Sequence, residues 1–128
     1  MNLLTDAAGE HVLLDWEDAG PGMPDRVLAS LLCNWGTHDG TINVGRVRRI
    51  LEAYRRAGGH AALTGLESFS SVLAGYVNYY IEAQASVSLD EAQPVDMRDH
   101  ATRELVSSLA DPPRLDLYRA LLGIAQGC

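Results

Sequence analysis

The chain has 128 residues, a formal net charge of −7, 47% hydrophobic residues and 21% charged residues. This length fits one small domain with a single core, and this composition is typical of a globular chain rather than a disordered one. The acidic balance argues against a nucleic-acid partner, and the lack of a signal-peptide pattern or a long apolar run argues against secretion and membrane insertion, so we expect a cytoplasmic protein.

A β-hairpin is predicted at the start of the chain. Two short apolar segments, 2–5 and 11–14, flank the turn-forming residues Asp6-Ala7-Ala8-Gly9. Gly9 suits the positive φ that a tight turn requires. The segment 15–24 that follows contains two glycines and two prolines, which exclude regular structure there.

Helical periodicity begins at Pro24, a residue that suits the first turn of a helix. Apolar residues at i, i+3, i+4 and i+7 predict a helix that ends at Gly36, before a polar stretch to Asn43. A second helix follows and is predicted to stop at the glycine pair Gly58-Gly59. The apolar faces are Leu28, Leu31, Leu32 and Trp35 in the first helix, and Val44, Val47, Ile50, Leu51 and Tyr54 in the second.

The third helix is predicted to be the longest, and Thr64-Gly65-Leu66-Glu67 fits a capping box at its start. We expect five of its residues to be largely buried against the last helix. These are Phe69, Leu73, Tyr76, Val77 and Tyr80, packed on Leu117, Leu121 and Leu122. Pro94 opens a fourth helix that ends at Asp111-Pro112-Pro113. The last helix, from Arg114 to about Ile124, is apolar on several sides, as buried helices are.

The pattern as a whole predicts an α-rich α+β fold, with a short β-hairpin followed by about five helices. The cysteines, Cys33 and Cys128, have no CxxC spacing, and no two histidines lie at i, i+4. The sequence therefore predicts neither a redox site nor a histidine metal site.

Asn2 and Asp15 stand at the two ends of the predicted hairpin. An Asn that opens one arm and an Asp that closes the other can bring two oxygen ligands together. Mg²⁺ prefers such ligands, and phosphoryl transfer needs Mg²⁺ to neutralise phosphate oxygens. The plain alternative is a hairpin whose Asn2 and Asp15 have no function.

The segment Asn2-Leu3-Leu4, ten residues, Asp15-Trp16-Glu17 and the loop to Pro24 resembles the kinase-like small-molecule phosphotransferases. These are the aminoglycoside phosphotransferases, the choline kinases and their relatives. Ala53-Tyr54-Arg55, near the end of a helix, also resembles a pattern of this family. The resemblance implies the C-terminal part of a kinase-like C-lobe. The chain would then be a single partial domain over 1–128, with the metal-site residues on the hairpin 1–15 and a helical part over 24–128.

The resemblance also implies residue roles. Asn2 and Asp15 match the family's metal ligands, and Glu17 matches a site-adjacent carboxylate whose role we do not assign. The complete family phosphorylates a hydroxyl of a small molecule, with Mg²⁺ and ATP as cofactors, and the acidic charge here is compatible with a cationic substrate. The family's general base lies five positions before the Asn. We therefore expect this base and the nucleotide lobe to be missing, no catalytic residue in this chain, and weak or absent binding of both cofactors.

Two further expectations follow from this resemblance. The family has an Asp just before a Leu-Ala pair in the first helix, whereas this chain has Val27 there, with Asp25 as the nearest substitute. A missing preceding segment would leave hairpin side chains uncovered, so we expect self-association through the hairpin. The side chains concerned are those of Leu3, Leu4, Val12, Leu14 and Trp16.

The alternative function, from a different class, is a non-catalytic helical module. The same helices would then bind a small ligand or a partner protein, through the surface that the missing lobe normally covers. Neither function involves nucleic acid or a membrane.

Overall fold

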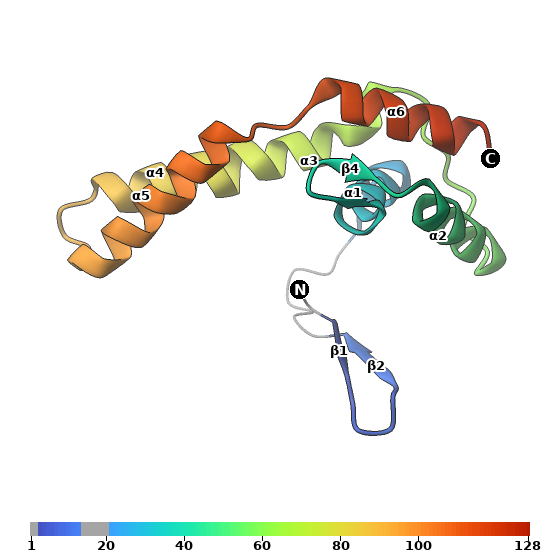
Figure 1. The fold of residues 1–128 in the computed structure, drawn as a ribbon, viewed down its shortest axis with the longest axis horizontal. Helices are drawn as coiled ribbons and strands as arrows, with labels where there is room; N and C mark the ends of the chain where they lie inside the picture. Colours follow the sequence, from blue (N-terminus) through green and yellow to red (C-terminus); the bar gives the residue numbers. More distant parts are fainter. Residues whose placement is uncertain (1–2, 14–20) are drawn as a thin grey trace.

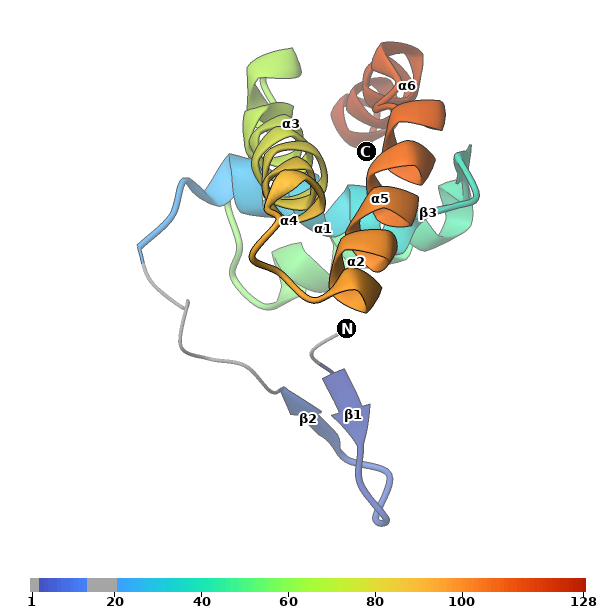
Figure 2. The same ribbon diagram turned by 90° about the vertical axis from the view of Figure 1, so that its left-hand side faces the viewer.

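The computed structural model describes residues 3–13 and 21–128. The predicted α-rich α+β class is confirmed, because a two-stranded hairpin is followed by a predominantly helical chain (Figure 1). The hairpin lies apart from the helices in both views (Figures 1 and 2). None of the helices in the described part of the chain has the length and apolar character needed to cross a membrane.

The predicted hairpin is formed by β1 (Leu3–Thr5) and β2 (His11–Leu13), which pair antiparallel with Leu3 opposite Leu13. The Asp6 carboxylate holds the turn, since its Oδ1 accepts hydrogen bonds of 2.9 Å from the backbone N–H groups of Ala8 and Glu10. Gly9 has a φ of +84°, as the turn prediction required.

The first two helices are α1 (Pro24–Gly36) and α2 (Val44–Arg56), and both were predicted. The side-chain oxygen of Asn43 caps α2, because it accepts a 2.9 Å hydrogen bond from the Arg46 N–H. Between them lies a second small hairpin, β3 (Thr37–His38) with β4 (Thr41–Ile42), where only a polar stretch was predicted. Its signal was the pair Asp39-Gly40, whose φ values of 47° and 68° suit a two-residue hairpin turn.

The predicted third helix is a continuous helical run with three different geometries. It begins as the 3₁₀ helix η1 (Leu66–Phe69), continues as α3 (Ser70–Gly75), becomes the π-helix η2 (Tyr76–Ala83) and ends as α4 (Gln84–Leu89). The capping box forms only in part. Thr64 Oγ1 donates to Glu67 Oε1 at 3.3 Å, whereas Gly65 occupies the N-cap position without a side-chain cap.

After the turn at 90–94, α5 (Val95–Ala110) runs back along α4, and the two helices form an arm that extends from the rest of the molecule (Figures 1 and 2). Tyr76 and Ser88 join the long helical run to α5. The Tyr76 hydroxyl donates to the Ser108 carbonyl at 2.9 Å, and the Ser88 and Thr102 hydroxyls lie 2.7 Å apart. The last helix, α6 (Leu115–Gln126), returns to the body of the molecule.

The core lies between α1, α2, η1 and α6. Phe69 is fully buried and stacks on Tyr118, with ring centroids 4.8 Å apart and an interplanar angle of 15°. The buried residues of this core are Leu28, Ala29, Leu32, Val47, Leu51, Leu63, Phe69, Tyr118, Leu121 and Ala125.

The predicted burial of the third helix holds for Phe69 but is wrong for the residues that follow it. Leu73, Val77 and Tyr80 are 42%, 51% and 48% exposed, and Tyr76 is half-buried. Val72 still packs against the core, and the helix then leaves the core and joins the arm. Its hydrogen bonds also change from i→i+4 to i→i+5 in η2, so the face predicted from a period of 3.6 is not the face that packs.

Candidate functional site

The residues that the resemblance assigns to the metal site, Asn2 and Asp15, lie outside the described residues, as does Glu17. Across residues 3–13 and 21–128, there is no group of three or more His, Cys, Asp or Glu side chains able to hold a metal ion. Among the hairpin side chains expected to be uncovered, Leu4 is 56% exposed. The side chains of Leu3 and Val12, together with Leu14 and Trp16, fall outside the described part.

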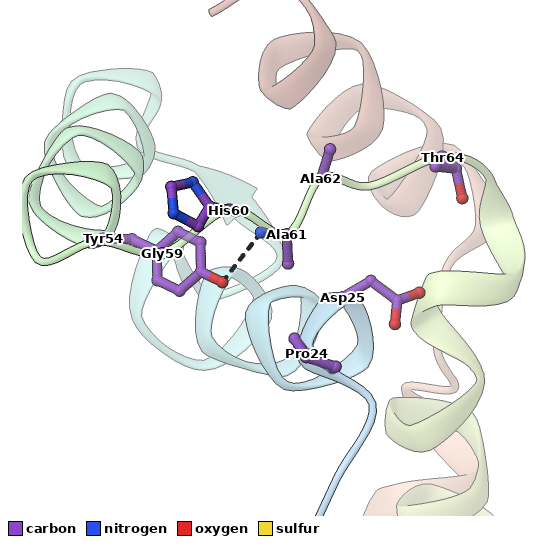
Figure 3. A pocket seen from close by; sticks show the side chains of 9 residues that line it. Pro24, Asp25, Tyr54, Gly59, His60, Ala61, Ala62 and Thr64 are labelled. Carbon is purple, nitrogen blue, oxygen red and sulfur yellow. Dashed lines mark hydrogen bonds between the residues drawn. The ribbon is translucent and has the colours of Figure 1, made fainter.

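The motif segment leads into α1, and the first residues of this helix line a pocket of about 520 Å³ (Figure 3). Pro24 and Asp25 come from α1, and Tyr54 comes from the end of α2. The remaining lining residues are 58–62 and Thr64, in the segment that joins α2 to η1. The pocket therefore lies where the start of α1 meets the end of α2 and the loop that follows it.

One wall of this pocket is built around Tyr54, which belongs to the Ala53-Tyr54-Arg55 pattern. Its hydroxyl accepts a 3.2 Å hydrogen bond from the Ala61 N–H. Gly59 lies directly against the ring, since a Cβ at this position would be 2.3 Å from two ring atoms. Gly58 ends α2 with a φ of +87°, in agreement with the predicted glycine stop. Tyr54 therefore holds the returning loop in place, and His60 lies beside it (Figure 3).

The opposite side of the pocket carries Asp25 (Figure 3). Its carboxylate is half-buried, and Oδ2 accepts a 3.0 Å hydrogen bond from the hydroxyl of Ser68, which is fully buried. Val27, at the position where the resembled family has an Asp, is 61% exposed. Asp25, and not residue 27, therefore joins the start of α1 to η1.

A second concave surface, called here the α1 groove, runs between α1 and the helical run of α3 and η2. It consists of two adjoining hollows of about 350 and 400 Å³, which share Ser30, Asn34 and Ser71. Tyr79 and Tyr80 line one hollow, with their rings edge to face at 5.2 Å and 83°. Sequence reasoning missed this groove because it assigned the tyrosine face to the core.

The pocket at the start of α1 is lined by several groups able to form hydrogen bonds. It presents a carboxylate, an imidazole and a phenol whose oxygen is already hydrogen-bonded. Such groups accept hydrogen bonds from a small polar or cationic molecule. Comparison of the chain with family models, with curated proteins and with solved structures found no match.

Proposed function

We propose that this chain is the C-terminal part of a kinase-like phosphotransferase lobe of the aminoglycoside phosphotransferase type, and that it does not catalyse phosphoryl transfer alone. The observation that supports this most is the hairpin that lies between the two halves of the motif. Asn2 directly precedes β1, and Asp15 follows β2 by two residues. Leu3 and Leu13 pair at the open end of the antiparallel hairpin. Asn2 and Asp15 adjoin this end in the sequence, which favours a shared metal site.

The donor chemistry fits the proposed ion. An amide oxygen and a carboxylate are hard ligands of the kind that Mg²⁺ takes. In the complete enzyme, Mg²⁺ would neutralise phosphate charge during ATP-dependent phosphorylation of a small-molecule hydroxyl. Two ligands without the nucleotide phosphates bind Mg²⁺ weakly, so the chain alone is expected to bind it in the millimolar range or not at all.

A second candidate function, a non-catalytic binding module, is favoured by the pocket at the start of α1. This pocket has the volume of a small-molecule site, about 520 Å³, and a carboxylate on one wall. Binding of a small molecule in this pocket would require neither a metal nor a nucleotide. Binding of a small cation that is lost in Asp25→Asn, with no metal effect at the hairpin, would favour this second function over the first.

Paramagnetic broadening by Mn²⁺ tests the metal site, because Mn²⁺ takes the same oxygen ligands as Mg²⁺. We expect Mn²⁺ to broaden the amide resonances of Leu3 and Leu13 more than those of Ala7 and Gly9 in the turn. Asp15→Ala should abolish this difference, whereas Glu10→Ala, which removes another hairpin carboxylate, should leave it unchanged. Broadening that is strongest at the turn, or that persists in Asp15→Ala, would contradict the proposed site.

An activity assay tests the second half of the proposal. The purified chain, mixed with ATP, Mg²⁺ and an aminoglycoside or choline, should form no product above buffer, because the base and the nucleotide lobe are expected elsewhere. Turnover that disappears in Asp15→Ala would show that the chain is active and that the inactivity proposed here is wrong.

A further inference from the structure

The apolar face of α1 is buried along one edge and exposed along the other. Leu28 and Leu32 lie in the core. Val27, Leu31 and Trp35, which lie four residues apart, remain 61%, 37% and 36% exposed. Residues spaced by four form one continuous ridge on a helix surface. Within the described residues, this ridge is not part of the core cluster or of the side chains packed against it.

The ridge itself lines one hollow of the α1 groove. The other hollow is lined by Tyr79 and Tyr80, which are 65% and 48% exposed. Both hollows are lined by the small or polar side chains of Ser30, Asn34 and Ser71. The surface therefore combines a ridge of large side chains with a groove of small ones.

The exposed apolar area of this surface can be compared with the area that a dimer interface buries. The three aromatic side chains leave roughly 300 Å² exposed, if a whole aromatic side chain offers about 200 Å², and Val27 and Leu31 raise this to roughly 400 Å². An exposed apolar area of a few hundred Å² often marks an interaction site. A stable dimer buries about 800 Å² per partner, of which about two thirds is apolar. The patch thus supplies most of the apolar area of a small interface, and its polar floor and rim enlarge it.

We propose that a second copy of this chain occupies the α1 groove and forms a two-fold symmetric dimer. The α1 ridge of each copy packs beside Tyr79 and Tyr80 of the other. A surface that carries both a ridge and a groove is complementary to itself, which is what a two-fold interface requires. Two such helices cross at about −50° when their four-residue ridges interdigitate. This interface does not depend on the phosphotransferase proposal, because it uses neither the hairpin nor the metal motif.

Charge affects the stability of this dimer in a testable direction. Among the described residues, Arg26 is the one charged residue that lines either hollow, so the contact itself carries little charge. The net charge of −7 on each copy opposes association from a distance. Salt screens that repulsion without weakening apolar contact. Dimerisation should therefore be stronger in 0.5 M than in about 0.05 M sodium chloride.

Sedimentation equilibrium of the full chain over roughly 1–500 µM tests the interface. We expect a monomer–dimer equilibrium whose dissociation constant rises at least about tenfold in Leu31→Glu and in Tyr79→Glu, because each buries an unpaired carboxylate on one side of the groove. Val106→Glu, at a 60% exposed position on α5, should leave the constant unchanged. Two variants on different helices guard against misfolding of either one, and circular dichroism checks the fold of both.

Several outcomes would overturn the interface. A monomer at every concentration, or a dimer that tolerates both groove variants, would exclude the α1 groove. A dimer that Leu4→Glu breaks and Leu31→Glu does not would place association at the hairpin instead. A dimer that weakens in high salt would indicate an electrostatic contact elsewhere.

Discussion

The hydroxyl of Ser68 donates a 3.0 Å hydrogen bond to Oδ2 of Asp25, across 43 residues of sequence. This bond joins the first turn of α1 to the 3₁₀ turn η1. Ser68 is fully buried, and its hydroxyl finds its acceptor in the half-buried Asp25 carboxylate. Asp25 therefore lines the pocket at the start of α1 and also links two elements of the fold.

Removal of the Asp25 carboxylate should destabilise the chain. Asp25→Ala leaves the buried Ser68 hydroxyl without its acceptor, which costs about 1–3 kcal/mol in free energy of unfolding. Asp25→Asn keeps a side-chain oxygen and should cost less than half as much. Urea denaturation measures both changes. Equal losses in the two variants would mean that the charge of Asp25, and not its hydrogen bond, stabilises the fold.

The aromatic pair Phe69 and Tyr118 should dominate the core. Phe69→Ala should cost about 3–5 kcal/mol, because it removes a fully buried ring that stacks on Tyr118 at 4.8 Å. Leu73→Ala, one turn later on the same helix, should cost less than about 1 kcal/mol, because Leu73 is 42% exposed. Denaturation midpoints of the two variants test this order. A cost for Leu73→Ala as large as that for Phe69→Ala would contradict the burial found here.

Two glycines should respond oppositely to alanine. A Cβ at Gly59 would lie 2.3 Å from atoms of the Tyr54 ring, so Gly59→Ala should displace Tyr54 and lower the thermal midpoint. Gly75, at the end of α3, has none of the described side chains within 4 Å of its Cβ position, and Gly75→Ala should raise stability by about 0.5–1 kcal/mol. A midpoint for Gly59→Ala equal to that of the unmodified chain would show that the loop next to Tyr54 adapts without cost.

Burial raises the pKa of the Cys33 thiol from 9.0 to about 11. At pH 8, a disulfide reagent should therefore modify the exposed Cys128 quickly and Cys33 only after unfolding. Between pH 9 and 11 the unfolded chain loses the thiol proton while the folded chain keeps it, so stability should fall as pH rises through this range.

The control for this pH dependence is Cys33→Ala, which removes the thiol. The fall in stability between pH 9 and 11 should become smaller in this variant, but it should not vanish. Burial also raises the pKa of Tyr118, which titrates in the same direction. A variant whose pH profile matches that of the unmodified chain would show that Cys33 does not contribute.

Local sequence signals determined where the regular elements lie. Pro24, Asn43 and Gly58 act within one turn of their own positions, through a fixed φ, a side-chain cap and a positive φ. Such effects require no distant partner. The hairpin turn at Asp6 and Gly9 is of the same kind, and all of these elements could be predicted without the fold.

Only the tertiary structure decided which faces those elements bury. The third helix has an apolar face with a period of 3.6, but its path along α5, and its π geometry from Tyr76 on, left Leu73, Val77 and Tyr80 outside the core. The hydrogen bond of Ser68 to Asp25 and the α1 groove likewise depend on how segments far apart in the chain meet. Periodicity identifies an apolar face, but burial of that face depends on the shape and position of its partner, because packing is a property of two surfaces.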